Sequence, residues 1–308
     1  MDRPLVSVLV ATYNQVAFVA EMVESVLAQS YPNVEIVVSD DGSTDGTAAA
    51  LRELTAGHAN VRLLLNEQNA GISGNCNRLL RAARGDYLAW LAGDDLMMPG
   101  KLERQVEALQ RHPAAVSCFH DAEVFDSDGA TIGLFSEFAN GTPGVREGGV
   151  ELLFDPTYKM LPSTMMFRAD AWPRHGFDEN LRYANDWLFT IEVFVNGPCV
   201  AIDEPLARYR RHPGNVTQHP AAARYGYEEG MAVMDLAQSR YPHLAGAVRG
   251  MRCALLLGQA RRDWGAGRRR RAIRSGLRAA ASGGAPRLAR ALASGYRRRV
   301  SAANSSKS

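Results

Sequence analysis

The chain has few cysteines and no long apolar run, and each absence excludes a class of protein. Its four cysteines, Cys76, Cys118, Cys199 and Cys253, are widely spaced and form no Cys-x-x-Cys pair, so neither a zinc site nor a disulfide framework is expected. No apolar run approaches the roughly 18 residues that a membrane-spanning helix needs. The short apolar stretch near the N-terminus follows Asp2 and does not resemble a signal peptide. These absences favour a cytoplasmic protein.

The net charge of +2 conceals a division between two parts of the chain. From Arg249 onward there are fifteen Arg and one Lys but a single acid, Asp263, so this part carries +15 and the preceding residues carry −13. The 308 residues, 46% of them hydrophobic, suffice for a large core and an appendage. An acidic body and a basic C-terminal region are expected to have different partners.

The N-terminal part alternates strand patterns with helix patterns. Apolar strands are predicted over 6–11, 34–39, 61–66 and 87–91, with helices over 16–29, 47–54 and 72–83 between them. This order predicts an α/β fold with a mostly parallel sheet and helices on both faces. Later predictions are helices over 101–110 and 187–195, and strands over 115–125, 199–202 and 206–210. Beyond about residue 221 the pattern is helical and rich in Ala and Arg.

The predicted strand from Tyr87 to Leu91 leads into two adjacent acids, Asp94 and Asp95. Ligands of open α/β sheets bind at the carboxyl ends of the strands, which is where these acids lie. Two neighbouring carboxylates repel each other and attract a hard divalent cation, which in turn can hold phosphate oxygens. The alternative is that Asp95 only caps the helix that begins near Pro99.

Polar side chains also follow the other three predicted parallel strands. They are Thr12, Tyr13 and Asn14 after the first strand, Asp40 and Asp41 after the second, and Asn69 and Gly71 after the third, with Asn75 and Asn77 in the helix behind it. Because the carboxyl ends of parallel strands meet at one edge of a sheet, all four clusters are expected to line that edge. This arrangement suits a nucleotide.

In this order and spacing the chain resembles the family 2 glycosyltransferases, which have a GT-A fold and transfer sugars from nucleoside diphosphate donors. The resemblance extends from about Pro4 to Thr217, and the stretches Asn77–Tyr87 and Asp94–Leu102 carry much of it. Each motif is weak alone, but the set is specific.

The resemblance also implies a division of the chain. Residues 1–217 would form a Rossmann-like GT-A domain, with a nucleotide-binding half over 1–112 and an acceptor-side half over 113–217. Beyond the resemblance, the composition of residues 218–308 predicts a helical, Arg-rich extension that ends in a disordered, Ser-rich tail.

The resemblance implies a nucleotide site with defined contacts. Tyr13 would stack on the base, and Asp41 would accept a hydrogen bond from a pyrimidine imide N–H, with Asp40 as the competing candidate. The alternative for both acids is turn chemistry, to which Asp-Gly-Ser-Thr-Asp is well suited. UDP or dTDP sugars are therefore the favoured donors. The other residues of the implied nucleotide site are Thr12, Asn14, Asn69, Gly71, Asn77 and Asp94.

The family resemblance also implies Mn²⁺ or Mg²⁺ as the cofactor. Asp95 would be a metal ligand, with Asp94 and His212 as further candidates. Many members read Asp-x-Asp-Asp here, whereas Ala92 and Gly93 precede the acid pair in this chain. His212 belongs to a segment that is similar to the family's closing segment, for which a solvated loop is the alternative.

A catalytic base is implied at Asp186. Gly176–Leu181 and Asn185–Trp187 are similar to the family's acceptor-side motif, whose usual Glu-Asp pair is Asn185-Asp186 here. Asp186 would take a proton from an acceptor hydroxyl as that oxygen attacks the anomeric carbon, with inversion. The alternative is that Asp186 is a helix N-cap, and both roles are compatible.

The basic C-terminal region has its own predicted partner. Its arginines interleave with apolar residues, among them Trp264, Ile273 and Leu277. This pattern predicts peripheral contact with anionic lipid at the inner face of the plasma membrane, which suits a lipid-linked glycan as acceptor. A nucleic-acid partner is not expected, because no recognisable nucleic-acid-binding fold accompanies the charge. A solvated appendage is the remaining alternative.

The sequence thus predicts a metal-dependent, inverting glycosyltransferase of the hexosyltransferase type, acting in polysaccharide or glycoconjugate synthesis for the cell envelope. One rival is a non-catalytic scaffold that binds sugar nucleotides, against which the presence of both Asp95 and Asp186 argues. The other is a sugar nucleotidyltransferase. That class is expected to carry a Gly-rich loop with Arg or Lys after its first strand, and Thr12–Val16 offers none.

Overall fold

The computed structural model describes residues 3–141, 144–218 and 220–282. The chain divides into two compact units, the first of residues 1–153 and 157–223 and the second of residues 154–156 and 224–308. The first unit contains a sheet, and the second is helical. The predicted disordered tail lies outside the described residues.

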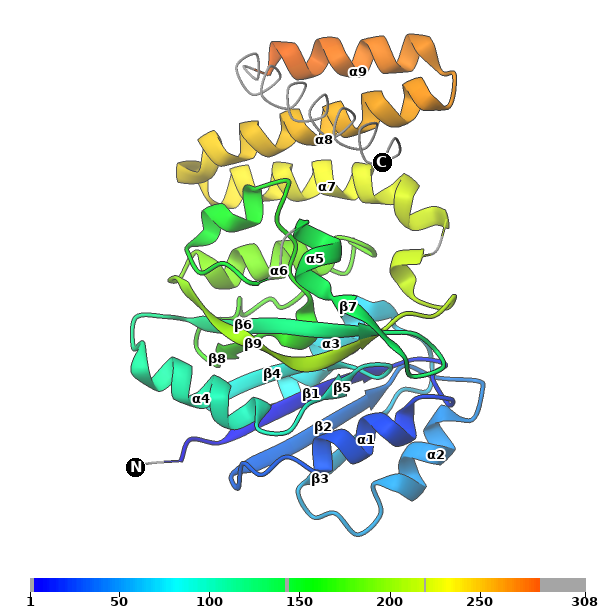
Figure 1. The fold of residues 1–308 in the computed structure, drawn as a ribbon, viewed down its shortest axis with the longest axis vertical. Coiled ribbons are helices and arrows are strands. Elements are labelled where there is room, and N and C mark those ends of the chain that lie inside the picture. Colours follow the sequence, from blue (N-terminus) through cyan, green and yellow to red (C-terminus); the bar gives the residue numbers. More distant parts are fainter. Residues whose placement is uncertain (1–2, 142–143, 219, 283–308) are drawn as a thin grey trace, which may run out of the picture. The chain divides into compact units, whose positions relative to one another are not determined.

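Four parallel strands and the helices between them form the N-terminal half of the first unit (Figure 1). They are β1 (Val6–Thr12), α1 (Val19–Leu27), β2 (Val34–Asp40), α2 (Thr47–Leu54), β3 (Val61–Leu65), α3 (Gly71–Ala82) and β4 (Tyr87–Ala92). In the sheet their order is β3-β2-β1-β4, and β1 pairs in parallel with both β2 and β4. The predicted α/β class is confirmed, and the carboxyl ends of these strands meet at one edge.

The local sequence explains these elements. Val8 and Leu9 of β1 point to opposite faces of the sheet and both are fully buried, as expected for a strand covered on two sides. Helix α1 buries Val19, Met22 and Val26 at helical spacing. The three residues belong to the core cluster that also contains Val8.

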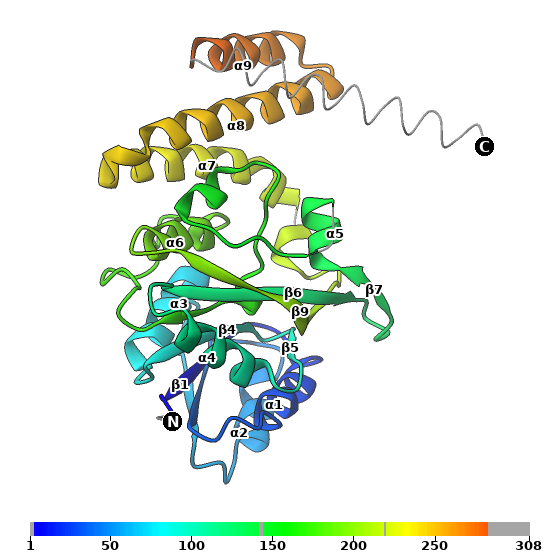
Figure 2. The same ribbon diagram turned by 60° about the vertical axis from the view of Figure 1, so that its left-hand side comes forward.

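The second half of the first unit has a mixed sheet. Its strands and helices are β5 (Leu96–Met97), α4 (Lys101–Arg111), β6 (Ser117–Phe125), β7 (Thr131–Leu134), α5 (Phe135–Asn140), β8 (Met166–Arg168), α6 (Asn185–Phe194) and β9 (Cys199–Arg210). Short 3₁₀ helices span Val150–Phe154, Pro162–Thr164 and Val216–Gln218. The sheet continues from β4 in the order β8-β6-β9-β5, and β7 pairs with β6. Strand β8 is antiparallel to β4 and β6. Strands β6 and β9 run in parallel (Figure 2).

Strand β9 differs from the prediction of two separate strands. The apolar pattern is interrupted around Pro205, but β9 continues from Cys199 to Arg210 because its pairing with β6 shifts register there. An irregularity in register adds residues without ending a strand. The long β9 therefore carries Arg210 to the edge at which β4 ends.

The second unit consists of long helices. They are α7 (Pro220–Arg240), which begins within the first unit, α8 (Ala245–Gly265) and α9 (Arg269–Ala281), with a 3₁₀ turn over Pro242–Leu244. Cys253 and Leu256 of α8 pack with Ala279 of α9. Gly267, with a φ of 74°, makes the turn between these two helices. Within the described residues, no helix has the length and apolarity to cross a membrane.

A fully buried lysine opens α4. Lys101 is 0% exposed, and its amine donates a hydrogen bond to Gln105 Oε1 at 2.8 Å. Burial lowers the pKa of Lys101 to about 7, whereas a lysine in an unfolded chain has a pKa of about 10.4. Between these values the unfolded chain binds a proton that the folded chain does not. The contribution of Lys101 to stability therefore becomes more favourable as pH rises from about 7 to about 10.

Replacing Lys101 with Met is expected to remove this pH dependence. Each pKa unit corresponds to about 1.4 kcal/mol, so the variant gains most over the wild type at pH 7 and progressively less toward pH 10. The loss of the donor to Gln105 Oε1 offsets about 1–3 kcal/mol of that gain at every pH. Urea unfolding of both proteins at pH 7, 8.5 and 10 measures the difference. An equal difference at all three pH values would contradict the assignment.

Candidate functional site

A cavity of about 540 Å³ opens in the first unit where β1, β2 and β4 end. This volume lies in the range of small-molecule binding sites. The predicted site residues that line it are Thr12, Tyr13, Asn14, Asp41, Asp94, Asp95, Asp186 and His212. Those that do not line it are Asp40, Asn69, Gly71 and Asn77. The cavity thus brings the predicted base, both predicted metal-binding acids and part of the predicted nucleotide site together.

The two adjacent acids after β2 have different surroundings. Asp40 is 1% exposed and accepts hydrogen bonds from Thr12 Oγ1 at 3.2 Å and from the Ser43 backbone N–H at 3.0 Å. Asp40 therefore makes the turn contacts that its sequence predicts. Asp41 lines the cavity, and its Oδ1 accepts hydrogen bonds from Asn66 Nδ2 at 2.7 Å and from the Ala70 N–H at 2.9 Å. These bonds fix the Asp41 carboxylate at the cavity wall.

Asn77 contacts another loop of the first unit. Its Nδ2 donates to Phe177 O at 3.0 Å and to Glu179 Oε1 at 2.9 Å, and its Oδ1 accepts from the Phe177 N–H at 2.7 Å. Asn77 thereby ties α3 to the segment that precedes α6. Asn69 Oδ1 accepts from the N–H of Gly71 at 3.0 Å, a turn that opens α3.

The residues after β1 form hydrogen bonds with the turn after β2. Asn14 has a positive φ of 51°, and its Oδ1 accepts from the Thr44 N–H at 2.9 Å while its own N–H donates to Ser43 Oγ at 2.8 Å. Such a backbone conformation is tolerated best by Gly and Asn. Next to it, the Tyr13 ring is 46% exposed and lines the cavity. An exposed aromatic ring beside a fixed carboxylate suits a planar base.

Asp95 is buried and held from two sides. It is 1% exposed, its Oδ2 accepts from Ser163 Oγ at 2.6 Å, and its Oδ1 accepts from the Arg210 backbone N–H at 3.0 Å. Burial and then the charge of Asp94 raise the pKa of Asp95 well above its ordinary value. The N-cap of α4 is Gly100, so the alternative that Asp95 only caps this helix is wrong.

Asp94 connects the acid pair to the segment after β9. Its Oδ2 lies 2.9 Å from His212 Nε2 and accepts from Asn215 Nδ2 at 3.2 Å. The His212 ring also packs against Phe18, with ring centres 4.5 Å apart. The segment that was predicted to be either part of the site or a solvated loop therefore contacts the acid pair directly.

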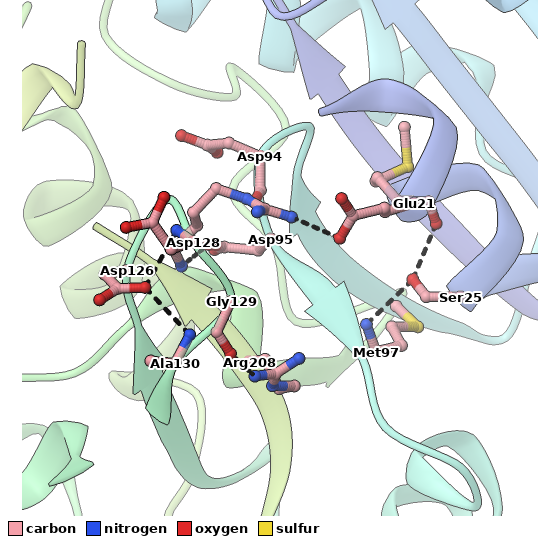
Figure 3. A network of polar contacts seen from close by, with 12 residues as sticks. Glu21, Ser25, Asp94, Asp95, Met97, Asp126, Asp128, Gly129, Ala130 and Arg208 are labelled. Atoms are coloured by element: carbon pink, nitrogen blue, oxygen red, sulfur yellow. Dashed lines mark hydrogen bonds and ion pairs between the residues drawn. The ribbon is translucent and has the colours of Figure 1, made fainter. Parts of the chain in front are cut away.

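Arg210 also supports the acid pair. Its Nε donates to the backbone oxygen of Asp94 at 3.0 Å. Its guanidinium pairs with Glu21 Oε2 of α1 at 2.9 Å, and Figure 3 shows Glu21 with the two acids nearby. Because Arg210 is only 3% exposed, its charge fixes the loop of Asp94 and does not line the cavity.

The acid pair Asp94 and Asp95 offers carboxylate oxygens, which are suitable ligands for a divalent cation. Among the described residues, no cluster of three or more His, Cys, Asp or Glu side chains has the spacing of a complete metal site. Mg²⁺ in nucleotide sites is commonly bound by only one or two carboxylates and takes its other ligands from waters and substrate phosphates. Asp94 and Asp95 both line the cavity, and the raised pKa of Asp95 marks a charge that a cation would compensate. The two carboxylates therefore fit a cation that takes its other ligands from waters and substrate phosphates.

Asp186 lies in the first turn of α6. The N-cap position is Ala184, and Asp186 Oδ1 accepts from the Trp187 N–H at 2.7 Å, so the prediction that Asp186 is itself the N-cap is wrong. Burial raises the pKa of Asp186, opposed by its own backbone hydrogen bonds and the charge of Lys159. The rings of Phe177 and Phe189, stacked 4.1 Å apart, line the same cavity. A carboxylate in such surroundings accepts a proton more readily than an exposed one.

Comparison with known proteins now decides the family. Residues 7–156 match the profile described as "Glycosyl transferase family 2". A glycosyltransferase of Haemophilus influenzae, itself uncharacterized, is 31% identical over 224 residues, which cover 70% of this chain and 67% of that protein. The chain belongs to glycosyltransferase family 2. It spans 58% of the length of the uncharacterized mycobacterial relatives that it matches at 32% identity.

Solved structures agree with the GT-A fold of this family 2 glycosyltransferase. S. aureus TarS 1-349 in complex with UDP-GlcNAc is similar with a TM-score of 0.64 and 19% identity, over 80% of this chain and 71% of TarS. The mannosyltransferase PcManGT from Pyrobaculum calidifontis, in complex with GDP-Man and Mn²⁺, gives a TM-score of 0.59 and 18% identity, over 95% of this chain and 81% of that one. At these identities the likeness shows the fold.

Three cavity residues of the glycosyltransferase make supporting contacts that no sequence pattern predicted. Asn75 lines the cavity and holds β2 by donating from Nδ2 to Ser39 O at 3.1 Å. Ser163 and Asn215 also line it and bond to the acid pair. Their segments were noticed only as parts of the family pattern. Their polar type gives no signal of its own, because each acts through a partner far away in the sequence.

Proposed function

We propose that this chain transfers a sugar from a nucleoside diphosphate sugar to an acceptor hydroxyl, with inversion at the anomeric carbon. Family membership supports sugar transfer, and the hexosyl type of the transfer is part of the proposal. The observation that carries the proposal is that Asp41, the pair Asp94–Asp95, and Asp186 all line one cavity of about 540 Å³. One cavity would then receive the nucleotide, its diphosphate and the acceptor hydroxyl.

The donor is proposed to be a UDP or dTDP sugar. Asp41 Oδ1 is occupied by Asn66 and Ala70, which leaves the second carboxylate oxygen to accept the imide N–H of uracil or thymine. The exposed Tyr13 ring would stack on that base. Asp40, whose oxygens are occupied in the turn, is the weaker candidate for the base contact.

The cofactor is proposed to be Mn²⁺ or Mg²⁺, held by Asp95 and Asp94 with His212 beside them. When bound, such a cation neutralises negative charge on the departing diphosphate. Ser163 and the Arg210 N–H orient the Asp95 carboxylate, and His212 with Asn215 orients that of Asp94. These contacts hold the two acids in place before a ligand arrives.

Asp186 is proposed to be the catalytic base. Its carboxylate accepts the proton of the acceptor O–H, while the acceptor oxygen bonds to the anomeric carbon and the bond from that carbon to the diphosphate oxygen breaks. The raised pKa of Asp186 makes this transfer more favourable than it is for an exposed aspartate. The apolar wall of Phe177 and Phe189 limits access of competing water.

The acceptor is proposed to be a hydroxyl of a growing polysaccharide or another glycoconjugate, of which a lipid-linked glycan is one form. Work at the inner face of the plasma membrane follows from the basic extension, which carries fifteen of the chain's arginines from Arg249 onward.

Release of nucleoside diphosphate tests the proposed function. The full chain is incubated with UDP, dTDP, GDP and CDP sugars and Mn²⁺, with and without simple glycan acceptors. Release of UDP or dTDP that increases with an acceptor is expected, together with inversion in the product. Binding of a nucleotide sugar without release under any condition would instead favour the non-catalytic scaffold.

The roles of Asp41 and Asp40 are separable by substitution. Asp41→Asn is expected to lower UDP affinity about tenfold or more, because a hydrogen bond to a charged group contributes about 1.5–3 kcal/mol. Asp40→Asn is the matched control. It is expected to lower the melting temperature of the protein, and to change UDP affinity less than Asp41→Asn does. Calorimetric titration with UDP and Mn²⁺ measures both variants. A larger loss of affinity in Asp40→Asn than in Asp41→Asn would reverse the assignment.

A further inference from the structure

Helix α9 exposes two large apolar side chains although it already has a buried face. Ile273 and Leu277, one turn apart, are 56% and 66% exposed. Ala272 and Ala279, on the opposite side of the helix, are 5% and 0% exposed. Ala279 packs with Cys253 of α8 in a local core. The exposed pair is therefore a second apolar stripe, separate from the face that holds α9 to α8.

Arginines border this stripe. Helix α9 has thirteen residues and no acid, and its exposed arginines are Arg269, Arg270, Arg271, Arg274 and Arg278. Residues three or four positions apart are neighbours on a helix surface, so Arg269 and Arg270 lie beside Ile273, and Arg274 lies beside Leu277. In the part of the chain that the structure describes, no ion pair neutralises Arg270 or Arg274.

The end of α8 continues this combination of exposed apolar and basic side chains. Trp264 is 55% exposed, and the Arg269 guanidinium lies over its ring, 3.8 Å from the centre. The only acid of this region, Asp263, has a side chain that is 4% exposed and pairs with Arg268 at 2.7 Å. From Arg249 to the end of α9, the accessible charged side chains are therefore all positive.

We propose that this surface, which we call the α9 face and define as Trp264, Ile273, Leu277 and the five α9 arginines, binds an anionic lipid bilayer. Apolar side chains of an amphipathic helix enter the boundary between headgroups and acyl chains, while flanking arginines approach lipid phosphates. Tryptophan is enriched at this same level of a membrane. Thirteen residues are too few to span the bilayer, so the helix lies in the plane of the surface.

Other occupants fit the α9 face less well. A second copy of the chain, docked through the same face, would bring two sets of arginines together without an acid on α9 to pair with them. A nucleic acid would use the arginines but would leave Ile273 and Leu277 exposed to water. Only a surface that is both anionic and apolar beneath its charges satisfies both kinds of side chain.

Vesicle flotation with the full chain tests the inference. Vesicles of phosphatidylcholine alone are compared with vesicles that also contain phosphatidylglycerol, at low and at physiological salt. The wild type is expected to float only with the anionic vesicles. Ile273→Ser combined with Leu277→Ser is expected to reduce the bound fraction about tenfold at physiological salt. Arg270→Gln combined with Arg274→Gln is expected to make binding more sensitive to salt.

A matched variant controls for the loss of exposed apolar area. Ile132 and Phe138 of the first unit are 45% and 53% exposed, and Ile132→Ser combined with Phe138→Ser is expected to leave flotation unchanged. A second comparison replaces Arg297, Arg298 and Arg299 with Gln in the full chain. Circular dichroism and the thermal shift caused by UDP confirm that each variant is folded.

Four outcomes would overturn the proposal. They are absence of flotation with anionic vesicles, an equal loss in the Ile132/Phe138 variant, loss only in the variant of Arg297–Arg299, and a dimer that the Ile273/Leu277 variant dissociates. Flotation needs no sugar donor, and the transfer assay needs no vesicle. Failure of the α9 inference is therefore distinguishable from failure of the proposed sugar transfer.

Discussion

Asp186→Asn is expected to lower the turnover number by about 10²–10⁴-fold, the usual contribution of a general base. The amide keeps the size of the carboxylate and can still accept the hydrogen bond from the Trp187 N–H, so the start of α6 is preserved. Donor affinity is expected to stay within about threefold, because Asp186 is proposed to contact the acceptor and not the nucleotide. Release of nucleoside diphosphate gives the rate, and calorimetry gives the affinity.

The pH profile provides an independent readout of Asp186. The wild-type rate is expected to rise with pH as the Asp186 carboxyl loses its proton, and burial moves this rise above the ordinary aspartate pKa of about 3.9. Asp170→Asn, at an exposed position, is the matched control and is expected to change neither rate nor profile. A variant Asp186→Asn with wild-type turnover would remove the base from the mechanism.

Asp95→Asn is expected to stabilise the metal-free protein and to abolish metal-dependent nucleotide binding. The amide can donate to Ser163 Oγ and accept from the Arg210 N–H, so it replaces both hydrogen bonds of the carboxylate. It also removes a charge that is 1% exposed and lies beside Asp94. The same charge that is unfavourable for folding would be needed to hold the cation, so stability and function are opposed at this residue.

The sign of the pH dependence follows from the raised pKa of Asp95. Below the pKa of the unfolded chain both states are protonated, and the carboxyl costs no stability. As pH rises above that value, the unfolded chain loses the proton first, and the cost grows until the folded carboxyl also ionises. The melting temperature of Asp95→Asn in EDTA is therefore expected to exceed that of the wild type at pH 7 and to approach it near pH 4. A lower melting temperature at pH 7, or a retained shift with UDP and Mn²⁺, would contradict this account.

The N-terminal half of the fold was predictable because its signals are local. Parallel strands that are buried on both faces read as continuous apolar runs, and β1 with Val8 and Leu9 is an example. Strand β9 was not predictable as one strand. Pro205 interrupts the apolar pattern, and only the shifted pairing with β6, a distant segment, lets the strand continue.

The candidate site was predictable in part for the same reason. Asp94, Asp95 and Asp186 stand at the ends of recognisable elements, so a sheet edge brings them together. The family resemblance favoured Asp41 over Asp40 for the base contact. Both follow β2, and the hydrogen bonds to Ser43 and Asn66 that distinguish them cannot be predicted from the sequence.

Supporting contacts of the site lay beyond sequence reasoning altogether. Ser163 and Arg210 reach Asp95 from segments 68 and 115 residues away along the chain. No periodicity or capping rule predicts such a long-range hydrogen bond, because it forms only when the strands around β4 assemble. The same holds for Asn77, whose bonds to Phe177 and Glu179 join α3 to a loop 100 residues later.

The measurement that tests the central claim most directly is the thermal shift of the wild type with UDP, dTDP, GDP and CDP, each in Mn²⁺ and in EDTA. A ligand that binds only the native state must raise the melting temperature by mass action. The predicted result is a shift with UDP or dTDP that is larger in Mn²⁺ than in EDTA. Asp41 would accept a hydrogen bond from the base, and Asp94 with Asp95 would bind the cation. No shift with any of the four nucleotides, in either condition, would contradict the donor site.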